Sequence, residues 1–195
     1  MWFFLCYNLN MKLYIRKITD IQSFTPDEET TRITGFLSLK KQKESLTGYF
    51  LLKDILKEKG YDTFKIIRKE NKRPYLDIPL FYSLSHSKDY VICMVETENI
   101  GIDIQYKTDQ LLNIRRRTGE TSDDIETLTI NWALKEAYIK YINDVKIPLK
   151  AIKINGENPY RLTYQEEAIC HIIKYEDYMI AVCSKADKKV VLVHD

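Results

Sequence analysis

The pattern of apolar and polar positions predicts a chain of short strands interrupted by a few helices. Apolar runs and alternations predict strands at residues 11–18, 64–68, 81–85, 90–95, 99–105, 150–154, 168–175, 178–184 and 189–193. Helix-forming sequence begins in the polar stretch 25–31, continues to residue 46, and then becomes a long apolar helix that Gly60 ends. A further helix is predicted at 128–143, whereas residues 107–130 are polar and show no clear period. Strands and helices are mixed without a regular β-α-β alternation, and this favours the α+β class over a doubly wound sheet.

The size and composition fit a folded protein of one large domain or two small ones. The chain has 195 residues, of which 45% are hydrophobic and 12% aromatic, and this is enough to form a packed core and exclude wholesale disorder. Its formal net charge of +2 gives no global reason to expect a nucleic-acid partner. No apolar run approaches the roughly 18 residues of a membrane span, so no membrane association is expected.

The first residues form an apolar stretch that does not fit a signal peptide. Residues 1–6 are apolar, but no basic region precedes them and the polar Asn8 and Asn10 follow closely. Met11 opens the first predicted strand, so we interpret residues 1–10 as an N-terminal extension. A cytoplasmic location is expected on this basis.

The cysteines Cys6, Cys93, Cys170 and Cys183 lie far apart in the sequence and form no Cys-x-x-Cys motif. Their even number permits disulfides, but in a reducing compartment we expect small buried thiols instead. Zinc is not expected either, because the three histidines are isolated from any pair of cysteines.

The helix predicted at 128–143 is the most informative segment for chemistry. A spacing of four residues places Trp132, Glu136 and Lys140 on one ridge of this helix. The simplest interpretation of Glu136 and Lys140 is an ion pair on the helix surface. The alternative is that both side chains face a ligand.

Asp103 lies in a strand whose two faces differ in character. Ile100, Ile102 and Ile104 alternate with Gly101, Asp103 and Gln105. One interpretation is a strand with one solvated face; the other is a carboxylate presented to a ligand, with Gly101 keeping that face open. Mg²⁺ bound to substrate phosphates usually takes one or two protein carboxylates, and Asp103 with Glu136 would satisfy this requirement.

Ser85 and His86 follow an apolar strand and are candidates for binding a phosphate group. Adjacent side chains of a strand point to opposite faces, so a nucleophilic Ser–His dyad is not expected here. Arg73 and Pro74 form a basic turn, and Arg32 with the lysines at 40, 41 and 43 adds charge upstream. Taken singly, each of these cations could equally be a solvated surface charge.

Four segments together resemble one known family. In chain order they are Arg73-Pro74, Phe81-Tyr82-Ser83-Leu84-Ser85-His86-Ser87, Ile100-Gly101-Ile102-Asp103-Ile104 and Trp132-Ala133-Leu134-Lys135-Glu136-Ala137-Tyr138-Ile139-Lys140. The order and content resemble the 4′-phosphopantetheinyl transferases, most closely their larger, pseudo-dimeric type. The matched region covers residues 72–140, with weaker similarity back to about residue 30.

The resemblance implies an enzyme that moves the 4′-phosphopantetheine arm of coenzyme A to a serine of an acyl or peptidyl carrier protein. The by-product would be adenosine 3′,5′-bisphosphate, and Mg²⁺, or alternatively Mn²⁺, would be required. By the motif match, Asp103 and Glu136 are the implied metal ligands. Glu136 is also the implied base that takes the serine proton, and Lys140 the implied contact to the pyrophosphate.

The resemblance also implies which residues hold coenzyme A. His86 and Ser85 would bind the 3′-phosphate, and Arg73 would hold the nucleotide end. Arg32 and Lys43 fall near the upstream basic contacts of the family, where the alignment is loose.

Two departures from the family pattern qualify this resemblance. Gln105 stands where the larger type usually has a third carboxylate, so a neutral amide oxygen or a water would complete the metal site. The stretch before the helix carries Arg115-Arg116-Arg117 and lacks the aromatic-rich segment that relatives often have. Carrier proteins are acidic, so this basic cluster could steer them by charge; the alternative is a solvated loop.

The implied fold is α+β, with two similar subdomains related by a pseudo-twofold axis and the coenzyme A cleft between them. We place the subdomains at residues 11–97 and 98–195, and we expect a monomer because one chain supplies both halves. Two other functions stay open at this stage. One is a non-catalytic homologue that binds coenzyme A or a carrier protein, and the other, more remote, is a nucleic-acid-binding domain.

Overall fold

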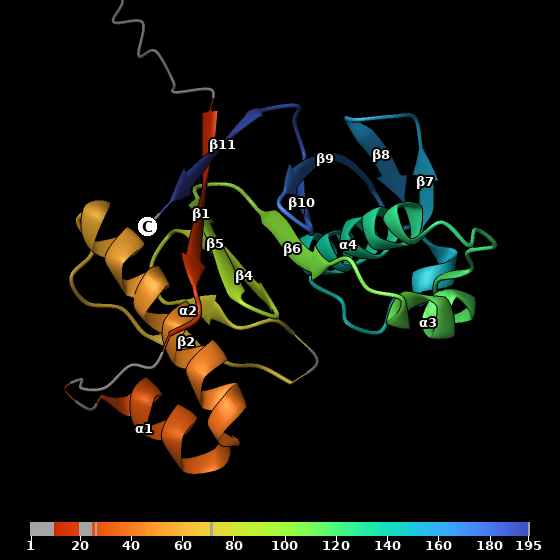
Figure 1. Cartoon of the computed structure of the whole chain (residues 1–195). Coiled ribbons are helices and arrows are strands. Elements are labelled where there is room, and N and C mark those ends of the chain that lie inside the picture. Colours follow the sequence, from red (N-terminus) through yellow and green to blue (C-terminus); the bar gives the residue numbers. More distant parts are fainter. Residues whose placement is uncertain (1–9, 20–24, 26, 71, 195) are drawn as a thin grey trace, which may run out of the picture.

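A computed structural model of the chain describes residues 10–19, 25, 27–70 and 72–194. The two halves lie side by side, with α1 and α2 in one half and α3 and α4 in the other (Figure 1). The predicted extension lies outside the described residues except for Asn10, and so does Cys6. Within these ranges, no helix has both the length and the apolar character needed to cross a membrane.

The first sheet has four strands and is covered by one long helix. Its order is β11 (Lys189–His194), β1 (Asn10–Lys17), β5 (Tyr90–Glu96) and β4 (Phe81–Ser87), with β1 and β11 parallel and the other pairs antiparallel. Helix α2 (Leu39–Glu58) packs Leu51, Leu52, Ile55 and Leu56 against this sheet. The spacing of these four residues is that of a single helix face. A shorter helix, α1 (Glu28–Phe36), and a small hairpin of β2 (Ile66–Ile67) and β3 (Tyr75–Leu76) complete this half.

The second sheet has five antiparallel strands. Its order is β6 (Ile100–Tyr106), β10 (Tyr178–Ser184), β9 (Glu167–Tyr175), β8 (Tyr160–Thr163) and β7 (Lys153–Asn155). Helix α4 (Ile125–Ile142) covers one face through Ala133, Leu134, Ala137 and Tyr138, which are fully buried. Helix α3 (Gln110–Thr118) and a 3₁₀ turn at Leu149–Ala151 flank it.

A shared apolar core joins the two sheets. It combines Leu13, Ile15, Ile92 and Met94 of the first sheet with Ile100, Ile102, Ile104, Ile180 and Val182 of the second. The outer faces of the sheets meet α2 and α4, so each central strand is buried on both sides. This explains why these strands read as nearly continuous apolar runs rather than clean alternations.

The structure confirms the α+β class and most of the predicted elements, and it corrects several boundaries. Helix α3 lies within residues 107–130 and was not predicted, because the three arginines of its last turn interrupt the apolar pattern. Strand β8 was not predicted either. The predicted subdomain boundary falls in the turn between β5 and β6. The last strand, β11, nevertheless pairs with β1, so a division at 97/98 does not separate the two sheets completely.

The expectation of free thiols throughout is wrong for two of the cysteines. Cys170 and Cys183 form a disulfide and lie directly opposite each other on the neighbouring strands β9 and β10. The two cysteines are 13 residues apart, and the hairpin of β9 and β10 brings them together. The spacing alone does not predict this pairing. Cys93 is free and buried, as predicted.

Candidate functional site

Three serines of β4 attach this strand to β6 and so define one wall of the site. Ser83, Ser85 and Ser87 alternate along β4 and therefore point to the same face. The hydroxyls of Ser83 and Ser87 accept hydrogen bonds from the backbone N–H groups of Ile102 and Tyr106, at 3.1 and 3.0 Å. Small hydroxyl side chains thus take the place of a backbone ladder where the two sheets meet.

Asp103 is the centre of a buried polar group on β6. Its residue exposure is 6%, and its Oδ1 accepts hydrogen bonds from Ser85 Oγ at 2.6 Å and Lys140 Nζ at 2.8 Å. The solvated-face interpretation of this strand is therefore wrong. The ion pair that the structure gives Lys140 is also not the surface pair with Glu136, because Lys140 reaches from α4 across to Asp103.

Gly101 has a different role from the one predicted. A Cβ at this position would lie 2.0 Å from the carbonyl oxygen of Ala137 and 2.4 Å from the backbone nitrogen of Tyr141. The open face of β6 is thus filled by the backbone of α4 rather than by a ligand. The absence of a side chain lets α4 approach β6 closely enough for its side chains to reach Asp103.

Glu136 shares this environment with Asp103. The pKa of its carboxyl group is raised, first by burial and second by the negative charge of Asp103, while Lys140 and Arg117 act in the opposite direction. Two neighbouring carboxylates form a natural site for a divalent cation. Among the described residues no cluster holds three or more carboxylate, histidine or cysteine ligands, so water or substrate oxygens would supply the rest.

Gln105 follows Asp103 on the same face of β6 and is partly buried. Its Nε2 makes one long hydrogen bond, 3.4 Å, to the carbonyl oxygen of Tyr106. The amide is therefore only weakly held by this contact.

Arg73 ties together three segments beside this group. Its guanidinium donates to the carbonyl oxygen of Ile100 and to Oδ1 of Asn99, both at 2.5 Å. Its backbone N–H donates to Oδ1 of Asn143, the left-handed residue that ends α4. Burial lowers the pKa of this guanidinium, and its direct partners are neutral oxygens. Arg73 thus connects the turn between β5 and β6 with the end of α4.

A cavity of about 460 Å³ opens next to these residues. We call it the basic cavity because five cationic side chains line it, and these are Arg32, Arg68, Lys72, Arg73 and Lys140. Ile33, Leu52, Tyr82 and Leu84 contribute apolar surface. A cavity of this size, lined by both apolar and cationic side chains, suits a long ligand that carries phosphate groups.

His86 and Lys43 lie elsewhere. His86 points to the opposite face of β4 from Ser85, where its Nδ1 is 3.7 Å from the carboxylate of Glu44 on α2. The side chain of His86 is 46% exposed, whereas that of Glu44 is 11% exposed. Lys43 precedes Glu44 on α2 and is exposed. Neither His86 nor Lys43 is among the described residues that line the basic cavity.

The structure thus divides the predicted site residues into groups. Ser85, Asp103, Glu136 and Lys140 lie together where β4, β6 and α4 meet. Arg32 and Arg73 join Lys140 at the basic cavity, which adds Arg68 and Glu29, two residues that the sequence did not single out. The alternating serines of β4 were visible in the sequence, but their common partner, β6, was not.

Comparisons with known proteins agree with the resemblance stated above. No family model matches the chain. The 4′-phosphopantetheinyl transferase gsp of Aneurinibacillus migulanus is 21% identical, over 84% of this chain and 78% of the relative. The 4′-phosphopantetheinyl transferase Sfp of Bacillus subtilis is 22% identical, over 83% of each chain. A further transferase of that name, ffp of Bacillus subtilis, is 24% identical over 80% of this chain and 86% of its own length.

Proposed function

The chain belongs to the 4′-phosphopantetheinyl transferase superfamily, and from this we propose that it transfers the 4′-phosphopantetheine arm of coenzyme A to a carrier-protein serine. Adenosine 3′,5′-bisphosphate would be the leaving group. The observation that carries the proposal is the group formed by the buried Asp103 and the partly buried Glu136 and Lys140 at the edge of the basic cavity. A protein that only binds its ligand does not need a carboxyl group whose pKa is raised, as that of Glu136 is, at this position.

Asp103 and Glu136 would hold Mg²⁺, or alternatively Mn²⁺, and the amide oxygen of Gln105 is the proposed third contact. The residues fit such an ion because both donors to Asp103 reach the same oxygen, Oδ1, and so occupy one side of this carboxylate. When bound, the cation would neutralise charge on the pyrophosphate of coenzyme A.

The protein side chains carry out the remaining steps. Lys140 contacts the pyrophosphate as a point charge, because its ammonium group already lies between the cavity and Asp103. Glu136, directly or through a water, takes the proton of the attacking serine hydroxyl, and its raised pKa suits a base of this kind. The serine oxygen bonds to the phosphorus that carries the pantetheine arm, and the bond from that phosphorus to the nucleotide oxygen breaks.

Coenzyme A would lie along the basic cavity with its nucleotide end near Arg73 and Arg32. Ser85, on β4, is proposed to contribute to binding the 3′-phosphate of coenzyme A. His86 is proposed to meet the 3′-phosphate, and this requires the phosphate to reach the face of β4 that now holds Glu44. Lys43 precedes Glu44 on α2 and is proposed to support that contact.

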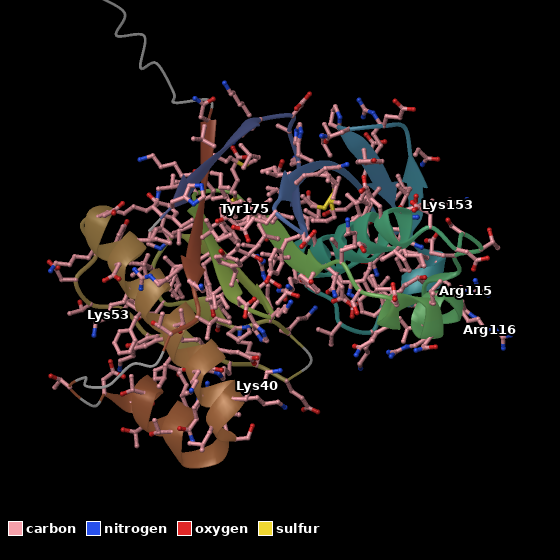
Figure 2. The ribbon with its side chains drawn as sticks, viewed as in Figure 1. Lys40, Lys53, Arg115, Arg116, Lys153 and Tyr175 are labelled. Carbon is pink, nitrogen blue, oxygen red and sulfur yellow. A yellow bond between two sulfur atoms is a disulfide. The ribbon has the colours of Figure 1, made fainter. Side chains whose placement is uncertain are left out.

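The wider proposal includes a pseudo-twofold relation between the halves 11–97 and 98–195, a monomeric state and a cytoplasmic location. Each half contributes one sheet and one long covering helix, and this supports the relation. The carrier protein is proposed to dock near Arg115-Arg116-Arg117 on α3, where Arg116 points outward at the rim of the molecule (Figure 2).

The test is the intact mass of an apo carrier protein after incubation with this protein, coenzyme A and Mg²⁺. We expect a gain of one phosphopantetheine group. Asp103→Asn should slow the transfer about 100-fold or more, the effect typical of losing one electrostatic contact to a transition state. Coenzyme A binding, measured by calorimetry on the same samples, should remain. If coenzyme A binds but several carriers gain no mass, the protein is a non-catalytic binder.

A further inference from the structure

The basic cavity contains one carboxylate among its cations. Glu29, in the first turn of α1, is the only acidic residue among the described residues that line it. The side chain of Glu29 is 14% exposed, whereas those of its two neighbours Arg32 and Arg68 are each 39% exposed. The carboxylate is therefore more deeply placed than the arginines that hold it.

Glu29 holds the two arginines through four hydrogen bonds. Arg68 donates from Nη1 to Oε2 at 2.9 Å and from Nη2 to Oε1 at 2.5 Å, which is the paired geometry of guanidinium and carboxylate. Arg32 donates to Oε1 from Nε at 3.1 Å and from Nη2 at 2.7 Å. Burial alone would raise the pKa of Glu29, but the hydrogen bonds from Arg32 and Arg68 lower it, so the carboxylate is charged.

The other cations of the cavity are held differently. Arg73 bonds to neutral oxygens, and Lys72 donates to the carbonyl oxygen of Asn143 at 3.2 Å. Lys140 is paired with Asp103, which does not line the cavity. We call Asp103, Glu136 and Lys140 the reaction group. Among the described residues that line the cavity, only Arg32 and Arg68 are paired with a carboxylate of the same lining. They come from different elements, α1 and the segment after β2, and they converge on one point.

We propose that Arg32 and Arg68 form a phosphate-binding site whose resident counter-ion is Glu29, which an incoming phosphate group displaces. The hydrogen-bond donors that now hold the two carboxylate oxygens match those that would hold two oxygens of a phosphate. One carboxylate leaves the two arginines with a net positive charge, whereas a phosphate dianion balances both. Glu29 therefore favours doubly charged phosphate groups over ligands with a single carboxylate, and it lowers the affinity for both.

The identification of this phosphate with one of coenzyme A rests on the proposed function. The anion site itself does not, because it is defined by the contacts of three side chains. Two probes separate these questions. Inorganic pyrophosphate, titrated without a divalent cation, reports anion binding in the cavity whether or not coenzyme A binds, and the variants at Glu29 and Arg68 assign that binding to this site. Coenzyme A tests whether the site belongs to the transferase substrate.

The experiment is calorimetric titration of both probes into the full chain and three variants at one fixed salt concentration. Glu29→Gln removes the counter-ion with almost no change in shape, and we expect it to tighten binding about tenfold. Glu28→Gln is the matched control, since it removes the same charge from the neighbouring, exposed position of the same helix turn. It should change affinity less than about twofold, because exposed charges are strongly screened. Arg68→Gln should weaken binding about tenfold or more.

Each outcome has a defined meaning. Tighter pyrophosphate and coenzyme A binding in Glu29→Gln, but not in Glu28→Gln, supports the inference. The same pattern with pyrophosphate and no coenzyme A binding by any protein supports the anion site and overturns the proposed function. Equal affinities of Glu29→Gln and Glu28→Gln for both probes overturn the inference and leave the proposed function standing. If circular dichroism shows that Glu29→Gln loses its helix, Arg68→Gln decides, and unchanged pyrophosphate binding in that variant also overturns the inference.

Discussion

The contact between Gly101 and α4 provides the sharpest test of how the reaction group is assembled. In Gly101→Ala, the new methyl group would meet three backbone atoms of α4, at 2.0 Å from the Ala137 oxygen, 2.4 Å from the Tyr141 nitrogen and 2.9 Å from the Tyr141 Cα. None of these atoms belongs to a flexible side chain that could move away. The substitution must therefore separate α4 from β6 or distort both.

The magnitude follows from the kind of atoms involved. Overpacking of a core typically costs about 1–3 kcal/mol, and contacts with backbone belong at or above the upper end of that range. For a domain of this size, each kcal/mol lowers the melting temperature by about 2–4 °C. We expect Gly101→Ala to melt about 6–12 °C below the parent protein. Because Lys140 and Glu136 lie on the displaced helix, transfer activity should fall as well.

Gly35→Ala is the matched control, since it adds the same methyl group where nothing lies within 4 Å of the new Cβ. It should leave the melting temperature unchanged or raise it, because alanine restricts the unfolded chain more than glycine does. The assay is thermal unfolding followed by circular dichroism or calorimetry, with both variants beside the parent protein. A melting temperature for Gly101→Ala within about 2 °C of the parent would refute the close approach of α4 to β6.

Three further predictions concern other parts of the molecule. Reduction of the Cys170–Cys183 disulfide should lower the free energy of unfolding by about 3 kcal/mol, and an unchanged urea midpoint with reductant would contradict this. Charge reversal at residues 115–117 should raise the KM for an acidic carrier about tenfold at low salt and leave coenzyme A binding unchanged. An equal KM for the parent protein and the variant would show that the carrier does not dock at these arginines. Lys135→Met deletes the hydrogen bonds from a buried ammonium group to Thr118 O at 2.6 Å and to Glu120 Oε1 at 2.7 Å. Chemical denaturation should therefore show a free energy of unfolding lower by about 1–3 kcal/mol. An unchanged free energy of unfolding would show that this lysine does not anchor α3.

The sequence by itself determined which face of each element its residues occupy. The alternation through β6 placed Asp103 and Gln105 on one face, and the period of α4 placed Glu136 and Lys140 on one ridge. It also predicted that Ser85 and His86 point in opposite directions, as they do. These relations depend only on the local geometry of strands and helices, so they can be predicted without knowing the partners.

The tertiary structure decided what each face meets. It paired Lys140 with Asp103 instead of Glu136, filled the space at Gly101 with a helix backbone, and joined Cys170 to Cys183. Each of these contacts links elements far apart in the sequence or depends on the register of two strands. Local periodicity contains no information about strand order or the distance between layers. Those are set by the packing of the whole core, so only the folded chain could show that Arg32 and Arg68 both pair with Glu29.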